Sequence, residues 1–483
     1  MTIFASCFSR ALPLVAAAVL AACGGGGGSE FSLSSKAGVS VRGGGSSADA
    51  SVDTSTPPPL PTLEQMTPVQ GAKVTAMAWI DSRTLELTIA SDAFAAPVKV
   101  EVFLPAGYLT DTKRRWAFTY YLGGTNHNQT TFRNDYSAYD LVENYPSLVV
   151  SPSGDSGYWS DWFNNGAGGP PKYETFVMDQ LLPLIDANFR TVGDRAHRAI
   201  MGDSMGGYGA LMIAARHPDK FAAAASLSGT VDTNFPTGMA AVSASPALQM
   251  GLPDSIYGPR LTQEVRWRGH NPWDLARNLA GMDLLVITGN GILGLADGEG
   301  GTDPAGCVLE AGAIYPESVN LHNQLTSLGI AHAWEPLPWG CHSKSLFRYE
   351  IKRAVARFEK VFAAAPTAPT QFDFRAVEPQ FAVYGWSVQA DPARALEFMD
   401  LRDVSATGLT VIGSGLTTIT TPGFFRGRSA VDIHIEGAVT SVRPDSAGRV
   451  VFAVDLGPAN ASQQYTLGST NDAQIRRVTF TPR

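Results

Sequence analysis

The sequence has few basic residues and few cysteines, and both shortages narrow what the protein can do. Lys and Arg number 36 against 44 Asp and Glu, no run of basic residues appears, and the formal net charge is −8. Because a nucleic-acid partner requires a concentrated basic surface, this composition argues against one. Only four cysteines are present, so each can be considered by itself. No internal repeat is visible, and 44% hydrophobic residues are enough for ordinary globular domains with a large core.

Long apolar runs are also missing. The run at residues 11–20 follows Arg10 and is too short to span a bilayer as a mature helix. It ends in Leu20-Ala21-Ala22-Cys23, which is similar to a bacterial lipobox. We therefore expect residues 1–22 to be a lipoprotein signal peptide, with a lipid attached to Cys23 after cleavage. The protein would then be lipid-anchored in the cell envelope, outside the cytoplasm. The alternative is an ordinary secretory signal, and in either case the chain is exported.

Residues 23–72 are rich in Gly, Ser, Ala and Pro, beginning with the run from Gly24 to Gly28. Such a composition cannot bury enough apolar surface to order itself. We expect this segment to be a flexible tether between the membrane and the folded part of the chain.

Residues 73–364 combine strand and helix patterns. Three alternating runs come first and suit antiparallel strands. After them, apolar runs alternate with helical segments, which predicts a largely parallel sheet with helices on both faces. The expected strands are 74–79, 84–89, 98–104, 116–122, 148–150, 198–201, 222–227, 283–288 and 331–335, and the expected helices are 174–189, 210–215, 318–328 and 345–362.

The pattern changes after residue 363. Residues 363–370 are rich in Ala, Pro and Thr and are typical of a linker. Short alternating runs follow at 409–412, 416–420, 431–435 and 450–454, with turn residues between them and no long helical period. We expect residues 365–483 to be this linker and a small β-sandwich-like domain without a catalytic constellation.

The strongest motif is Gly202-Asp203-Ser204-Met205-Gly206, between a predicted strand and a predicted helix. This pattern is typical of a nucleophile elbow, in which a strained turn lifts the serine above the sheet and only small residues fit two positions away. The backbone N–H of Met205 would lie at a helix N-terminus, where it can donate to a developing oxyanion. The alternative is a Gly-rich connection with an incidental serine, but the strand before it and the helix after it favour catalysis.

A nucleophilic serine needs a base and a group that orients the base. In α/β-hydrolases the chain order is nucleophile, acid, histidine, which excludes His127 and His197 as the base. His217 lies at the end of the helix after the elbow. His342 lies between the last predicted strand and the last predicted helix of the domain, so it is the predicted base. The acid lies between Ser204 and His342, and spacing alone leaves Asp297, Asp303, Glu310 and Glu317 open.

Several motifs resemble the secreted esterase D and antigen 85 mycolyltransferase branch of the α/β-hydrolases. The similarity covers about residues 75–362 and keeps the order of the motifs, which are residues 154–163, 172–176, the elbow, 288–291, 308–310 and 340–343. The resemblance implies an α/β-hydrolase fold. It places the acid in a Leu-Glu pair, here Glu310, and a second oxyanion N–H at Thr125.

The resemblance also has departures. Where the mycolyltransferases carry Asp-Gly-Leu-Arg, this chain has Gly123-Gly124-Thr125-Asn126, and Lys344 stands where an aromatic residue is expected. The residues that hold a sugar acceptor are therefore missing. We expect a serine esterase that acts on esters with an apolar acyl chain through Ser204, Glu310 and His342, with no metal and no cofactor. The alternatives are acyl transfer to a sugar or lipid alcohol, or a non-catalytic relative that binds carbohydrate or matrix.

The cysteines lead to one more expectation. Cys7 would leave with the signal peptide and Cys23 is assigned to lipid, so Cys307 and Cys341 remain. Outside the cytoplasm two such thiols usually pair. Cys307 lies three residues before Glu310, and Cys341 directly precedes His342, so a functional acid and base would bring the cysteines together. We expect a disulfide between them.

Overall fold

The computed structural model describes residues 60–294 and 304–483. The predicted signal peptide, Cys23 and most of the predicted tether lie outside these ranges, as do Asp297 and Asp303. Within the described ranges, no helix combines the length and apolar character needed to cross a bilayer.

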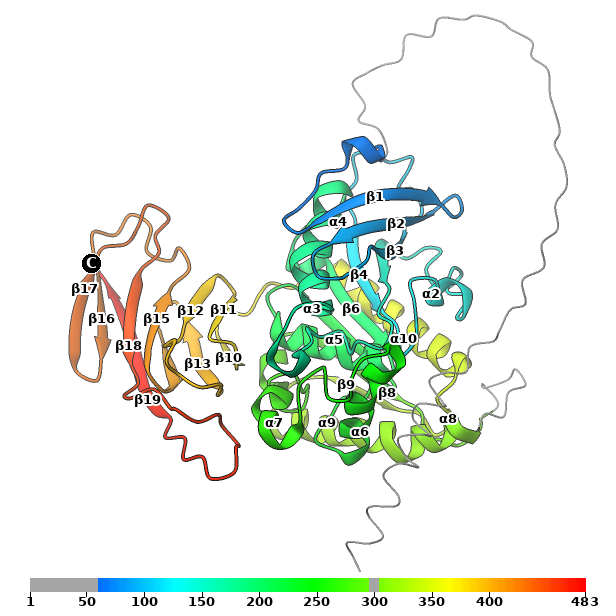
Figure 1. Ribbon diagram of the computed structural model, residues 1–483. Coiled ribbons are helices and arrows are strands. Elements are labelled where there is room, and N and C mark those ends of the chain that lie inside the picture. Colours follow the sequence, from blue (N-terminus) through cyan, green and yellow to red (C-terminus); the bar gives the residue numbers. More distant parts are fainter. Residues whose placement is uncertain (1–59, 295–303) are drawn as a thin grey trace, which may run out of the picture.

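A nine-stranded mixed sheet forms the centre of the first domain (Figure 1). Its order is β1-β2-β3-β5-β4-β6-β7-β8-β9; the pairs from β1 to β5 along this order are antiparallel, and all later pairs are parallel. This arrangement confirms the predicted α/β-hydrolase fold. The strands are β1 Ala72–Trp79, β2 Thr84–Ser91, β3 Val98–Phe103, β4 Ala117–Leu122, β5 Ser147–Pro152, β6 Arg198–Asp203, β7 Ala223–Leu227, β8 Asp283–Thr288 and β9 Ala333–Pro336.

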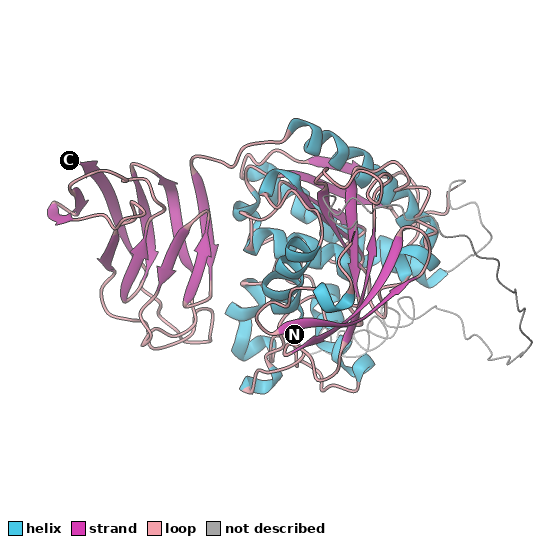
Figure 2. Cartoon of the chain, turned by 90° about the horizontal axis from the view of Figure 1, so that it is seen from above, coloured by secondary structure: helices cyan, strands magenta, loops and turns pink. Residues whose placement is uncertain are grey.

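Helices cover both faces of this sheet (Figure 2). Strand residues alternate between two apolar cores: Tyr120 packs with the helices α3, α4, α5 and α9, whereas Tyr121 packs with α2 and α10. The helices are α2 Thr131–Asn134, α3 Tyr173–Thr175, α4 Leu182–Asn188, α5 Met205–Arg216, α6 Pro236–Ala244, α7 Arg260–Arg268, α8 Pro304–Leu309, α9 Tyr315–Ser327 and α10 Lys344–Ala364. Two π-helical segments join neighbouring helices, η3 Phe176–Leu181 and η8 Glu310–Ile314, and short 3₁₀ turns occur at η1 Leu63–Gln65, η2 Asn164–Gly166, η4 Arg195–His197, η5 Ser245–Gln249 and η6 Ala276–Leu279.

The packed domain begins earlier than the sequence predicts. The tether was expected to extend to residue 72, but η1 forms at Leu63–Gln65 and Met66 is buried in the core below β1. Val69 also packs against this core. These apolar side chains lie among Pro and Thr residues, so the composition of the segment does not indicate that it packs against the domain.

The C-terminal domain consists of two antiparallel sheets that enclose one apolar core, as the sequence predicts. One sheet has the order β10-β13-β14-β19-β16-β17 and the other β11-β12-β15-β18. Their strands are β10 Phe372–Ala376, β11 Gln380–Val383, β12 Trp386–Gln389, β13 Met399–Ser405, β14 Gly408–Gly413, β15 Leu416–Thr420, β16 Val431–Ile435, β17 Ala438–Val442, β18 Val451–Asp455 and β19 Gln474–Pro482.

The two domains meet at the end of α5 that lies farther from Ser204. Arg216, the last residue of α5, contacts Glu174 at 2.7 Å and Glu378 of the C-terminal domain at 2.8 Å. The side chain of Asn278 accepts from the backbone N–H of Arg375 and donates to its carbonyl, both at 2.9 Å. The C-terminal domain is therefore attached to the helix that begins at the elbow, but at the opposite end of that helix.

Candidate active site

The carboxyl ends of five neighbouring strands bring the candidate residues together. In a parallel sheet these ends share one edge, where α/β proteins place their ligands. The segments that leave this edge are Gly123 to His127 after β4, Ser204 after β6, Ser228 after β7, Gly289 to Gly291 after β8, and the loop to His342 after β9. Residues far apart in the sequence thus meet at one edge.

Ser204 lies on a sharp turn between β6 and α5. Its backbone has φ 54° and ψ −121°, a region that side chains rarely adopt, and such strain is typical of functional positions. Close packing requires the flanking glycines: a Cβ on Gly206 would lie 1.9 Å from the carbonyl oxygen of Leu122, and one on Gly202 would lie 2.4 Å from the oxygen of Gly206. The turn therefore fits only with glycine at both positions.

Ser204, His342 and Glu310 form one hydrogen-bonded chain. Ser204 Oγ is 2.8 Å from His342 Nε2, and His342 Nδ1 is 2.7 Å from Glu310 Oε2. Because the carboxylate takes the hydrogen on Nδ1, the lone pair of Nε2 faces the serine hydroxyl. Phe347 packs edge-on against the imidazole, with 4.8 Å between ring centroids. This arrangement can accept a proton from Ser204.

Of the four acids that spacing leaves open, the structure brings Glu310 to His342. Glu310 is fully buried at the start of the π-helical segment η8. Its Oε1 accepts from Ser228 Oγ at 2.7 Å, Thr288 Oγ1 at 2.8 Å and the N–H of Gly289 at 2.9 Å. These donors hold Oε1 and leave Oε2 for the imidazole. Glu317 instead accepts from Thr237 at 2.9 Å, and burial raises its pKa well above the usual range.

Two backbone N–H groups at this edge of the sheet, those of Met205 and Thr125, have no acceptor among the described residues. Met205 is the first residue of α5, so its N–H has no acceptor within the helix. In the described part of the chain no acceptor takes the N–H of Thr125 either. The loop that carries Thr125 is fixed on both sides, since Asn126 N–H donates to Asp155 at 2.6 Å and Trp159 Nε1 donates to Gly123 at 3.1 Å.

Three other histidines were set aside as the base from the sequence, and each has a partner of its own in the structure. His127 Nδ1 accepts from the N–H of Gly124 at 2.8 Å and thereby braces the same loop. That nitrogen is also 3.4 Å from Asp203, but while it accepts from Gly124 it carries no hydrogen for the carboxylate. His197 pairs with Asp194 on the surface, and His217 caps α5 beside Glu174.

Ser228 and Glu350 belong to no motif that singles them out, whereas Thr288 is the first residue of the motif at 288–291. Ser228 and Thr288 were detectable in principle, because one follows and the other ends a parallel strand. Glu350 lies in the middle of α10, and nothing in the local sequence distinguishes it from an ordinary helical glutamate. No group of three or more His, Cys, Asp or Glu side chains within residues 60–294 and 304–483 could hold a metal ion.

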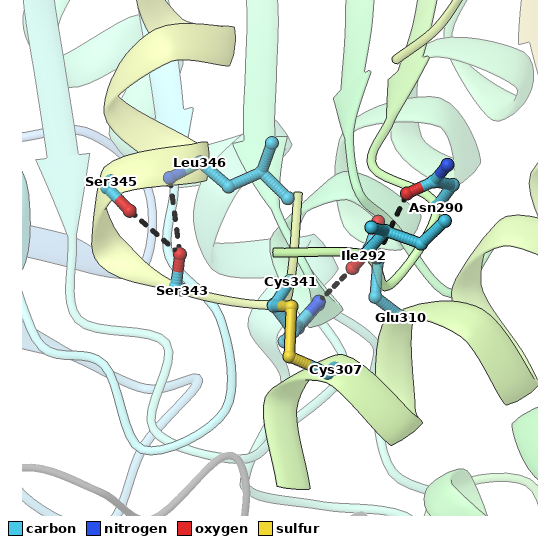
Figure 3. Close-up of a disulfide and its surroundings, with 9 residues drawn as sticks. Asn290, Ile292, Cys307, Glu310, Cys341, Ser343, Ser345 and Leu346 are labelled. Carbon is cyan, nitrogen blue, oxygen red and sulfur yellow. Dashed lines mark hydrogen bonds and ion pairs between the residues drawn. A yellow bond between two sulfur atoms is a disulfide. The ribbon is translucent and has the colours of Figure 1, made fainter. Parts of the chain in front are cut away.

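The acid-bearing and base-bearing segments are joined by a disulfide (Figure 3). It links Cys307 of α8 to Cys341, residues 34 apart in the sequence. Beside it, the backbone N–H of His342 donates to the carbonyl of Gly306 at 3.1 Å. The bridge thus constrains η8, which carries Glu310, and the loop that carries His342 at the same point.

Comparisons with known proteins point to one family. A family model described as "Putative esterase" matches residues 91–358. An esterase of Mycobacterium tuberculosis is 29% identical over 281 residues, which cover 56% of this chain and 58% of that protein. A diacylglycerol acyltransferase/mycolyltransferase of Mycolicibacterium smegmatis is 27% identical over 222 residues, 44% of this chain and 67% of that protein.

Among solved structures, MPT51 of Mycobacterium tuberculosis aligns with 56% of this chain and 96% of its own, with 22% identity and a TM-score of 0.47. The chain spans 58% of the length of the M. tuberculosis esterase, so the alignment leaves a large part of that relative unmatched.

Reducing the disulfide is expected to lower stability and activity together. Opening a loop of 34 residues lowers the free energy of unfolding by about 3–4 kcal/mol on the chain-entropy estimate. It also loosens the contact between Glu310 and His342. We expect the Cys307→Ser, Cys341→Ser double variant to melt at a lower temperature and to turn over an aryl ester more slowly. Thiol counting on the unfolded, unreduced protein is the control. Free thiols on both Cys307 and Cys341 would show that the disulfide does not form.

Proposed function

The chain belongs to the esterase family, and from this premise we propose that it is an exported, lipid-anchored serine esterase that cleaves carboxylic esters through an acyl-enzyme intermediate. The observation that carries the proposal is the chain of hydrogen bonds from Ser204 Oγ through His342 to Glu310, at 2.8 and 2.7 Å. Burial of all three side chains supports it, since low solvent exposure strengthens each electrostatic contact.

In the proposed reaction, Ser204 Oγ attacks the ester carbonyl while its proton passes to His342 Nε2. Glu310 stabilises the imidazolium, and the N–H groups of Met205 and Thr125 donate to the oxyanion. His342 then protonates the departing alcohol. Water activated by His342 hydrolyses the acyl-enzyme and restores the serine. No metal and no cofactor are required for these steps.

Acyl transfer to an alcohol is the second candidate. It is favoured by the similarity to the diacylglycerol acyltransferase/mycolyltransferase of Mycolicibacterium smegmatis. The same acyl-enzyme would be intercepted by a sugar or lipid alcohol instead of water. Residues 123–126 lack the Asp and Arg of the mycolyltransferase motif, so we place hydrolysis first. A non-catalytic binding role is disfavoured because serine, histidine and glutamate are all in place.

Replacement of the nucleophile is the first test. Ser204→Ala should fold normally and lose about 10⁴-fold in kcat for an aryl ester, because only oxyanion and binding contributions remain. Product masses from wild-type reactions, with and without added trehalose or glycerol, separate hydrolysis from transfer. A Ser204→Ala enzyme that retains more than a few per cent of its activity would mean that another group is the nucleophile.

The acid is tested by Glu310→Gln, which removes the charge that stabilises the imidazolium. We expect a loss of several orders of magnitude in kcat, on the order of 10⁴ by analogy with other triads. Glu317→Gln is the matched control: burial raises the pKa of Glu317, so an amide mimics the neutral acid and activity should change little. Asp297→Asn and Asp303→Asn should also be mild. An inactive Asp303 variant beside an active Glu310 variant would overturn the assignment.

The anchor is tested by Cys23→Ser. Without the thiol no lipid can be attached, so the protein should shift from the membrane fraction to the soluble fraction or remain unprocessed. The measurement is metabolic labelling with a fatty acid, combined with fractionation. Label on the Cys23→Ser protein would exclude Cys23 as the modified residue.

A further inference from the structure

Glu350 is a buried carboxyl group directly behind Glu310, and the reaction above does not use it. It lies on the inward face of α10 and is as fully buried as Glu310. Its Oε1 is 2.8 Å from Ser228 Oγ, and the same hydroxyl is 2.7 Å from Glu310 Oε1. Its Oε2 is buried without a hydrogen-bond partner among the described residues. Two buried carboxyl groups therefore share one serine hydroxyl.

Counting hydrogens decides which carboxyl group is charged. Ser228 has one hydroxyl hydrogen and can donate it to only one acceptor. Glu310 also receives hydrogen bonds from Thr288, the N–H of Gly289 and His342, whereas Glu350 has no other partner in the described chain. An ionised Glu350 would leave a charged oxygen buried without a donor, which costs far more than a neutral carbonyl there.

The charged groups that face Glu350 act in the same direction. They are Glu310 of η8 and Asp203 of β6, both acidic. Burial, and then repulsion from the charge on Glu310, raise the pKa of Glu350 well above the usual range for a glutamate. Two adjacent buried carboxylates without a shared proton would be unstable.

We propose that Glu350 is held as the neutral acid and is a positioning residue for the triad: its O–H donates to Ser228 Oγ, which commits the Ser228 hydrogen to Glu310. The donor order is Glu350 to Ser228 to Glu310 Oε1, with His342 on Glu310 Oε2. Glu310 Oε1 thereby keeps its hydrogen bond from Ser228, and Oε2 of the same carboxylate stays in contact with His342. An ionised Glu350 would instead accept from Ser228 and withdraw a donor from Glu310. The inference rests on the proposed function for the role of Glu310.

Infrared difference spectroscopy tests the protonation state without any substrate. The full-length wild type is compared with Glu350→Gln at neutral pH, and Glu359→Gln, an exposed glutamate of the same helix, is the control. We expect the C=O stretching band of a protonated carboxylic acid to be lost in Glu350→Gln, and carboxylate bands to be lost in Glu359→Gln. Loss of carboxylate bands in Glu350→Gln would overturn the proposal. This result does not depend on whether Ser204 is the nucleophile.

The pH dependence of stability is a second test of the protonation state of Glu350. A glutamate that is neutral in the fold releases its proton on unfolding above about pH 4.3, so its folded-state pKa lies above its unfolded value. The stabilisation that the neutral Glu350 contributes is then fully present below about pH 4.3. It declines as the pH rises above that value. Relative to Glu350→Leu, the unfolding constant of the wild type should increase with pH above about pH 4.3, by about tenfold per pH unit for as long as Glu350 stays neutral in the folded protein. A difference that stays flat with pH would contradict a neutral Glu350.

Kinetics separate positioning from simple structural support. Glu350→Leu fills the same space but removes the donor that orients the Ser228 hydroxyl toward Glu310. With that hydroxyl free to rotate, kcat should fall about tenfold while KM stays within about twofold and the melting temperature does not fall. Glu350→Gln keeps an N–H donor and should restore kcat to within about threefold of wild type. If Leu and Gln are equally impaired, or if only the melting temperature changes, Glu350 does not position the triad.

Discussion

The close approach of the elbow to the end of β4 is the constraint on which the site depends. A single Cβ on Gly206 would lie 1.9 Å from the Leu122 carbonyl oxygen, so the turn and the strand can be in contact only without side chains. That contact brings the N-terminus of α5 beside the loop that carries Thr125. The same turn forces Ser204 into a strained backbone conformation, and the packing of β6 and α5 around it sustains the strain. The backbone at Ser204 and the loop that carries Thr125 are therefore held by the same contact.

Buried charge is the second organising feature, and the structure manages it by concentrating donors on one carboxylate. Glu310 receives three hydrogen bonds on Oε1 and one on Oε2. These donors supply the hydrogen bonds that a buried carboxylate needs. Glu317 and Glu350 are equally buried, each has one carboxyl oxygen without a hydrogen-bond partner among the described residues, and burial raises the pKa of each. The difference between the three acids lies in their surroundings and not in their chemistry.

The C-terminal domain contacts the hydrolase domain at the far end of α5, through Arg216 and its two carboxylate partners. Although burial acts in the opposite direction, the charges of Arg216 and His217 lower the pKa of Glu174. The guanidinium therefore holds two acidic groups from different domains in place. The β domain contributes none of the side chains of Ser204, His342 and Glu310.

Local sequence determined the elements and singled out Ser204 and His342 as candidates. Alternation and helical period depend on neighbouring residues, and they predicted the mixed sheet, the C-terminal β domain, the elbow at Ser204 and the loop of His342. Tertiary structure decided the rest. Spacing left four acids open, and only packing brings Glu310 within 2.7 Å of His342. Ser228 and Glu350 join the site from positions 122 residues apart. No local period encodes such a meeting, because it arises when separate strands and helices pack at one edge of the sheet.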